Sequence, residues 1–83
     1  MTDKKTLQLN IARVDGSLYM GAVVSVTVPG SEGEMTLLAD HSPLMTVLRK
    51  GVVTVRPEEG EEVTFSVETG TLEVSNNQVT ILL

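Results

Sequence analysis

The clearest structural signal in this sequence is the stretch GVVTVRPEEGEEVTFSV, which runs from Gly51 to Val67. Val53 and Val55 alternate with polar residues before a charged loop, and Phe65 and Val67 alternate in the same way after it. Apolar residues at every second position indicate strands with one face toward a core, and a loop with Pro and Gly is typical of a hairpin. The stretch therefore predicts two antiparallel strands joined by a polar turn at residues 57–60.

The same period of two recurs along the rest of the chain. Residues expected to share a face are Leu7, Leu9 and Ile11; Val24, Val26 and Val28; Leu72 and Val74; and Val79 and Ile81. Turn signals such as Asp15-Gly16 and Asn76-Asn77 separate the stretches at intervals of about 8–12 residues, which is typical of antiparallel sandwiches and flattened barrels. Moreover, 25 of the 83 residues are Val, Thr or Ile, and these residues favour strands. We predict an all-β fold, a flattened antiparallel β-sandwich of two sheets with about 8–10 short strands. It forms a single domain over residues 1–83.

Composition excludes several classes of protein. Lys and Arg number 6 against 11 Asp and Glu, for a formal net charge of −5, so the chain lacks the basic clusters of a nucleic-acid-binding protein. The absence of cysteine excludes disulfides and thiolate metal sites. No apolar run approaches the roughly 20 residues of a membrane-spanning helix, and residues 1–5 show no signal-peptide pattern. We expect an intracellular protein with an aliphatic core, in which Met20, Met35 and Met45 are core fillers.

The lone histidine, His41, is the first candidate for catalytic chemistry. It lies between Asp40 and Ser42, the residue types of a hydrolytic triad. A triad is defined by its geometry in space, and three consecutive residues of an extended loop point in different directions. We therefore expect His41 to make a loop contact, and we predict no catalytic residue.

Metal and phosphate sites find equally little support. His41 and the carboxylates near it lack a zinc-like spacing with a second His or Cys. The acidic run Glu58–Glu62 lacks the pattern of a calcium-binding loop. The loop Gly30–Glu34 has two carboxylates and no Gly-Lys-Ser/Thr ending, so it does not suit a phosphate. The residues alone predict a small acidic all-β domain without metal or cofactor, which binds a partner.

Two further stretches carry a family resemblance. Residues 26–35 read VTVPGSEGEM, and residues 40–51 read DHSPLMTVLRKG. This order of a strand, Gly-x-x-Gly-Glu and a His-x-Pro-Leu run ending in Gly resembles the epsilon subunit of the rotary F-type ATP synthase. Residues 70–74, GTLEV, and 77–82, NQVTIL, resemble the last two strands of its N-terminal β-sandwich domain. The pieces keep the family's order over nearly the whole chain.

The resemblance implies a role for the chain. In this family the β-sandwich sits at the foot of the central stalk, as one copy per complex. There it binds the gamma subunit and the membrane-embedded c-ring, and it helps to couple proton- or sodium-driven rotation to ATP synthesis without catalysing a reaction. The resemblance also implies a peripheral location on the cytoplasmic face of the bacterial inner membrane. It implies no cofactor, no small-molecule substrate, no nucleic acid and no direct insertion into the bilayer.

Carried onto this sequence, the family's contacts fall on two sets of residues. The c-ring contacts are expected at Ser31, Glu32, Glu34 and His41. The gamma contacts are expected at His41, Leu44, Met45, Thr46 and Val47. Carboxylates at a loop tip complement the basic loops that are usual in the family's ring. Of the alternating residues in the gamma-facing strand, one set must belong to the core, so we expect a mixed role for it.

Two rival interpretations and one departure from the family remain. The family's helical hairpin would begin where this sequence stops at Leu83, so we expect it to be missing. Its roles in inhibiting ATP hydrolysis and, in some members, in binding ATP are therefore not assigned to these residues. The first rival is a free-standing β-sandwich that binds a ligand or a protein; a small ligand or carbohydrate would need surface aromatics for stacking, and only Tyr19 and Phe65 are available. An enzyme needs a pocket in which His41 meets carboxylates.

Overall fold

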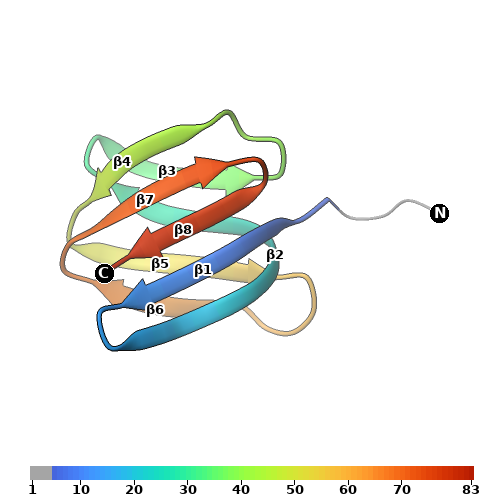
Figure 1. The fold of residues 1–83 in the computed structure, drawn as a ribbon, viewed down its shortest axis with the longest axis horizontal. Helices are drawn as coiled ribbons and strands as arrows, with labels where there is room; N and C mark the ends of the chain where they lie inside the picture. Colours follow the sequence, from blue (N-terminus) through green and yellow to red (C-terminus); the bar gives the residue numbers. More distant parts are fainter. Residues whose placement is uncertain (1–4) are drawn as a thin grey trace.

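The computed structural model describes residues 5–83, which form eight β-strands and no helix (Figure 1). The expectations that concern residues 1–4, among them the missing signal peptide and the start of the domain, lie outside these residues. The strands are β1 (Leu7–Arg13), β2 (Gly16–Gly30), β3 (Gly33–Leu38), β4 (Leu44–Leu48), β5 (Gly51–Pro57), β6 (Val63–Val67), β7 (Gly70–Ser75) and β8 (Gln78–Leu82).

The strands form two packed layers, which confirms the predicted all-β sandwich (Figure 1). The front sheet contains β4, β7, β8, β1 and the first half of β2, and the back sheet contains β3, the second half of β2, β5 and β6. These pairs are antiparallel except β1 with β8, which run parallel from Gln8–Gln78 to Ala12–Leu82. A period of two indicates which face of a strand is buried but not the direction of its neighbour, so the parallel pair is not predicted.

β2 is the strand that joins the two sheets. Its residues up to Val23 pair with β1, its residues from Ser25 to Gly30 pair with β3, and those from Ser25 to Thr27 also pair with β5. Val23 lies opposite Pro57 and Ser25 lies opposite Arg56, so Val24 is an extra residue without a partner on β5. Such a bulge bends a strand and increases its twist. The bulge therefore lies where β2 passes from the front sheet to the back sheet.

The bulge also changes which residues of β2 are buried. The alternation predicts Val24 in the core with Val26 and Val28, but Val23 takes that place and Val24 is only half-buried. One inserted residue shifts the alternation, so that the strand residues before it point to the opposite face from the one predicted. Gly21 does not divide the strand, because β2 is continuous over 15 residues. The structure therefore has eight strands, at the low end of the expected range.

Aliphatic side chains from both sheets fill the space between them. The alternation predicted in the 51–67 stretch is confirmed, because Val53 and Val55 are fully buried. Tyr19 and Phe65 pack against this core and meet edge to face, with ring centroids 6.1 Å apart. At roughly 1.5–3 kcal/mol for each buried side chain, the core is the main source of stability. The buried residues are Leu7, Leu9, Ile11, Val23, Val26, Val28, Leu37, Leu48, Val53, Val55, Val67, Leu72, Val74, Val79 and Ile81.

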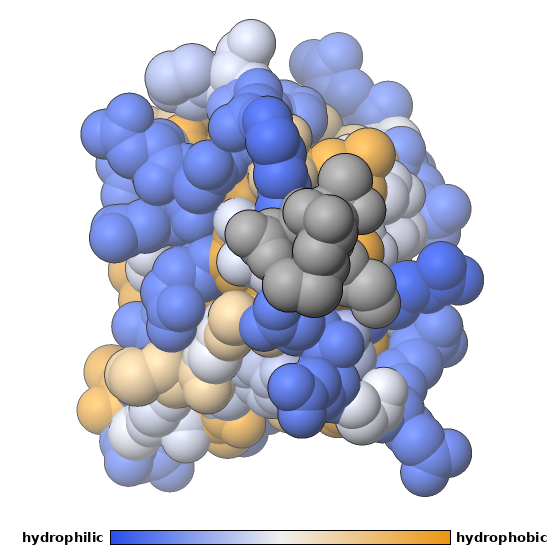
Figure 2. Space-filling view, turned by 90° about the vertical axis from the view of Figure 1, so that its right-hand side faces the viewer, coloured by the Kyte–Doolittle hydropathy of each residue, from blue (hydrophilic) through white to orange (hydrophobic). Residues whose placement is uncertain are grey.

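The methionines do not share one role. Met35 on β3 packs against the core as predicted, but Met20 and Met45 are 66% and 77% exposed, so the core-filler prediction is wrong for both. Each belongs to an apolar stretch in which both faces of the strand are apolar, and this hides the alternation. Seen from one end of the sandwich, apolar areas lie between larger hydrophilic ones (Figure 2).

Gly70 allows β7 to approach the end of β8. A Cβ atom at this position would lie 2.7 Å from the backbone oxygen of Leu82 and 2.9 Å from a methyl carbon of Leu83. We expect Gly70→Ala to lower the free energy of unfolding by roughly 1–3 kcal/mol, because the backbone must shift. Gly21→Ala is the control, since its Cβ would meet only Tyr19 at 3.8 Å. Urea unfolding measures both variants, and equal losses would contradict this account.

Candidate functional site

The turn between β2 and β3 forms an exposed acidic tip made of Ser31, Glu32 and Glu34. Gly30 and Gly33 pair across the turn, and a Cβ on Gly30 would lie 2.9 Å from the carbonyl oxygen of Gly33. Gly33 has a φ of +134°, which residues with a side chain rarely adopt. The Ser31 N–H donates to a carbonyl oxygen of β4 at 2.9 Å. The two glycines and this hydrogen bond hold the tip in one shape.

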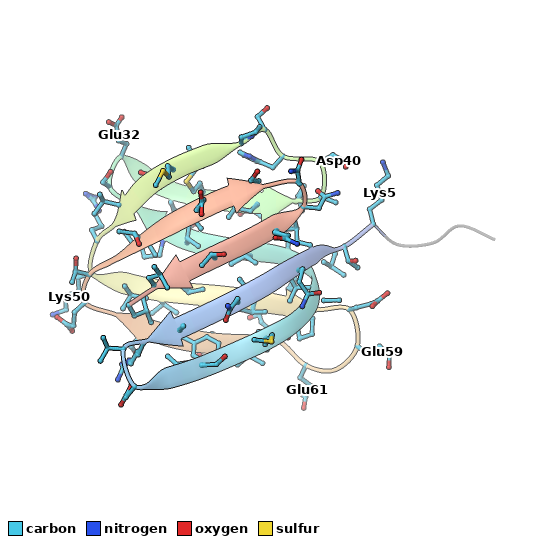
Figure 3. All side chains as sticks on the ribbon, in the orientation of Figure 1. Lys5, Glu32, Asp40, Lys50, Glu59 and Glu61 are labelled. Atoms are coloured by element: carbon cyan, nitrogen blue, oxygen red, sulfur yellow. The ribbon has the colours of Figure 1, made fainter. Side chains whose placement is uncertain are left out.

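His41 lies at the opposite end of the sandwich from the acidic tip. The whole of β3 separates them, and Figure 3 shows Glu32 and Asp40 at opposite ends of the molecule. The structure therefore brings Ser31, Glu32 and Glu34 together, but it does not bring His41 to them. The sequence motif places these residues within a dozen positions of one another, and an intervening extended strand separates them in space.

The segment around His41 shows no catalytic arrangement. The Nδ1 atom of His41 lies 2.8 Å from the backbone oxygen of Ser42, not near its hydroxyl. The Asp40 carboxylate is bonded to Lys5 and Asn77 instead of the imidazole. Within residues 5–83, no three His, Asp or Glu side chains gather closely enough to hold a metal ion. The same residues contain no helix with the length and apolar character needed to cross a membrane.

β4 divides its residues between the core and the surface. Leu44 packs against the core and Thr46 is half-buried, whereas Met45 and Val47 are 77% and 54% exposed. The predicted gamma-contact residues on β4 thus separate into two alternating pairs. Met45 and Val47 are available to a partner, and Leu44 and Thr46 support them from behind.

Met45 and Val47 belong to an apolar patch on the outer face of the front sheet. Met45 lies beside Glu73, and Val47 lies beside Thr71, which in turn lies beside Leu82. Leu82 is 53% exposed, and these side chains line a shallow groove. We call Met45, Val47 and Leu82 the outer patch. Adjacent exposed apolar residues with a polar rim mark interaction surfaces. Leu82 is not among the predicted residues, because only the strand order shows that β8 lies close to β4, with β7 alone between them.

A polar cluster joins three distant segments at the His41 end of the sandwich. The side-chain oxygen of Asn77 accepts a hydrogen bond from the Asp40 N–H, and Asn77 Nδ2 donates to Asp40 Oδ1 at 3.1 Å. Lys5 Nζ donates to Asp40 Oδ2 at 2.7 Å. We call Lys5, Asp40 and Asn77 the clasp. The sequence predicts a turn at Asn77, but no local pattern pairs residues 37 positions apart.

The two charged members of the clasp stabilise each other's ionised form. The hydrogen bond from Lys5, with a second from Asn77, holds the pKa of the Asp40 carboxyl below its usual value. The hydrogen bond to Asp40 raises the pKa of Lys5 above its usual value. Both side chains are largely exposed, at 77% for Lys5 and 55% for Asp40, so salt screens their attraction.

Comparison with known proteins relates the whole sandwich to one family. The model of the ATP synthase delta/epsilon chain beta-sandwich domain matches residues 6–83. The ATP synthase epsilon chain of a Nitratiruptor species is 37% identical over 78 residues, which cover 94% of this chain and 60% of that relative. The epsilon chain of Sulfurimonas denitrificans is 38% identical over 77 residues, covering 93% and 59%. The chain thus spans less than two thirds of the length of these curated relatives.

Two solved structures are similar to the sandwich. A chain in the cryo-EM structure of Euglena gracilis mitochondrial ATP synthase, OSCP/F1/c-ring in rotational state 1, matches with a TM-score of 0.88 and 25% identity. The match covers 99% of this chain and 52% of that chain. A chain of the Tetrahymena thermophila mitochondrial ATP synthase central stalk and c-ring matches with a TM-score of 0.77 and 18% identity, over 98% and 65%. This second likeness concerns the fold alone.

The clasp predicts how Asp40 titrates. We expect Lys5→Gln to raise the pKa of the Asp40 carboxyl toward its ordinary value of about 3.9, as followed by NMR of the carboxyl carbon. Lys50→Gln, at the opposite end of the molecule (Figure 3), is the control and leaves the Asp40 titration unchanged. An Asp40 titration that Lys5→Gln does not move would contradict the ion pair.

The same ion pair predicts the pH dependence of stability. Because the folded-state pKa of Asp40 is lowered, its stabilising effect is present above the unfolded pKa and disappears as pH falls through the folded pKa. Because the folded-state pKa of Lys5 is raised, its effect disappears as pH rises through that pKa. We expect Lys5→Gln to lower Tm slightly at neutral pH. Thermal unfolding in acid, where Asp40 is protonated, or at high salt should show no difference from the unmodified chain.

Proposed function

This chain belongs to the beta-sandwich family of ATP synthase delta/epsilon chains, and from this premise we propose that it is a non-catalytic docking subunit of the central stalk. In this proposal the outer patch contacts the gamma subunit, and the acidic tip contacts the c-ring. One copy is bound per complex, and it helps to couple ion-driven rotation to ATP synthesis without binding nucleotide. It is held peripherally at the cytoplasmic face of a bacterial inner membrane.

The outer patch is the observation that carries the proposal. Met45, Val47 and Leu82 are each more than half exposed, and they lie on one sheet face, on β4 and β8 with β7 between them. Covering them removes apolar area from water, which is worth roughly 25 cal/mol per Å². Because Leu44 packs against the core behind them, the backbone that carries Met45 and Val47 is already ordered before binding. The Euglena relative, whose structure contains F1 and the c-ring, supports a stalk setting for such a face.

The acidic tip supports the proposed contact with the c-ring. Glu32 and Glu34 are exposed, and neither ion pair of the described residues includes them. Their carboxylates are therefore available to the basic loops that the family resemblance implies for the ring. Lys50 lies at the same end of the molecule (Figure 3), so this end presents charges of both signs to a partner.

His41 is assigned in this proposal to the gamma contact instead of the c-ring contact. It lies at the end of the sandwich opposite the acidic tip, and it precedes the residues of β4 that carry the outer patch. A partner that covers β4 can reach His41 where the strand begins and the acidic tip where it ends, beside Val47, whereas a partner confined to the tip does not reach His41.

The gamma contact is tested by placing a charge in the outer patch. We expect Val47→Asp to weaken binding to purified gamma subunit by roughly tenfold or more, about 1.4 kcal/mol, because a buried carboxylate loses its hydration. Val52→Asp is the matched control, since Val52 is 50% exposed, close to the 54% of Val47, and lies on the back sheet. Isothermal titration calorimetry measures both affinities, with thermal unfolding as the check on folding. Equal affinities for the two variants would exclude the outer patch.

The c-ring contact is tested by reversing a charge at the tip. We expect Glu32→Lys to weaken binding to a detergent-solubilised c-ring by an amount typical of an exposed ion pair, about 0.5–1 kcal/mol. The difference should shrink as salt is raised, because exposed charges are screened. Glu59→Lys, in the β5–β6 loop at the other end (Figure 3), is the control. A loss of binding that is independent of salt, or that is shared by Glu59→Lys, would refute the contact.

A further inference from the structure

We infer that the clasp positions the gamma-docking segment: Asn77 and Lys5 hold Asp40 in place, and this fixes the direction in which His41 and the start of β4 are presented. The inference rests on the proposed function and extends it to residues outside the contact surface. Asn77 and Lys5 act in it as positioning residues, because they act through Asp40.

The backbone of Asp40 sets the direction of the segment that follows it. Asp40 has a φ of +66°, the left-handed region that residues other than glycine enter only at a cost in energy. Asp is one of the residues that reaches this region when its side chain forms local hydrogen bonds. Here the N–H and both carboxylate oxygens of Asp40 are bonded to Asn77 and Lys5. The left-handed conformation directly before His41 is therefore held by partners outside its own loop.

Asn77 is a rigid anchor for this conformation. Its backbone oxygen accepts a hydrogen bond from the Gln8 N–H at 2.8 Å, which ties it to β1. It lies in the tight turn between β7 and β8, two strands that have neighbours on both sides in the front sheet. The loop that contains Asp40 connects β3 to β4 and has no such support of its own. The sheet therefore determines where the loop lies.

The clasp is the polar connection between the segment 39–43 and the rest of the described chain. Apart from the His41 N–H to Leu38 oxygen bond of 3.2 Å and the His41 ring contact within the segment, its hydrogen bonds run through Asp40. Figure 2 views the molecule from this end, and the surface visible there outside the grey atoms is mostly hydrophilic. The hydrogen bonds of Asp40 are therefore the polar contacts that tie this segment to Lys5 and to the β7–β8 turn.

Asn77→Gly removes the side-chain contacts and keeps the turn. Asn77 has a φ of +59°, which glycine adopts without strain. Asn76→Gly is the matched control, because Asn76 has a φ of +50° in the same turn and makes no clasp contact. Asn77→Asp is a second variant, which keeps an acceptor for the Asp40 N–H but replaces the donor with a second carboxylate beside that of Asp40.

Two measurements on these variants test the inference. Hydrogen exchange of the Asp40 amide reports directly on the clasp, and calorimetry with purified gamma subunit reports on docking. We expect Asn77→Gly to speed exchange and to lower affinity by roughly two- to tenfold, as for the loss of a hydrogen bond. Asn77→Asp should have at least as large an effect at neutral pH, because its carboxylate repels that of Asp40, and Asn76→Gly should change neither quantity.

Three results would overturn the inference. Unchanged exchange in Asn77→Gly would show that the clasp does not hold the segment. Faster exchange with unchanged affinity would show that the clasp orders the segment without any role in docking. If the unmodified chain fails to bind the gamma subunit, the proposed function itself falls, and the docking role of the clasp falls with it. The exchange data still separate Asn77→Gly from Asn76→Gly in that case, so the two failures are distinguishable.

Discussion

The change of partner within β2 is the constraint on which the rest of the arrangement depends. The strand pairs with β1 up to Val23 and with β3 and β5 from Ser25 onward, and the extra residue Val24 provides the bend between them. One continuous strand therefore holds the two sheets face to face. Because its far end pairs with β4 at Gly30–Leu48, it also brings the acidic tip beside the strand that carries the outer patch.

The surfaces proposed for docking are rigid because buried residues lie directly behind each of them. On β4, Leu44 and Leu48 occupy the core side while Met45 and Val47 face outward. At the tip, Gly30 is buried against Gly33, and Ser31 is bonded to β4. The backbone of such surfaces is already ordered before binding, so the conformational entropy lost on binding comes mainly from the exposed side chains.

Local patterns of the sequence were enough for most of the fold. Alternation identified the strands and most of the core, since burial on one face leaves a period of two in any strand, as at Val53 and Val55. The alternation predicted the wrong burial for Val24, because a bulge opposite β5 changes which residues of the strand face the core. It also predicted the wrong burial for Met20, because both faces of that strand are apolar. The parallel pairing of β1 with β8 could not be predicted, because the direction of a neighbouring strand does not change which side chains of a strand are buried.

Most residues of the candidate site could be predicted from the sequence, but their arrangement in space could not. The family resemblance indicated both Glu32 and His41, and the structure separates them by the length of β3. The clasp was missed because its members come from the start of the chain, a loop and a late turn, and each looks like an ordinary polar residue on its own. Only the three-dimensional structure shows that Asn77, besides forming a turn, is hydrogen-bonded to Asp40.

The parallel contact between β1 and β8 has a consequence for how the domain assembles during translation. β8 lies between β7 and β1, so the front sheet cannot be completed until β8 has been synthesised. Until then β1 can pair only with β2, and its other edge, with Leu7, Leu9 and Ile11 beside it, is open to foreign strands. The nascent chain therefore passes through a stage in which it is vulnerable to aggregation, and that stage ends only when the first and the eighth strand meet.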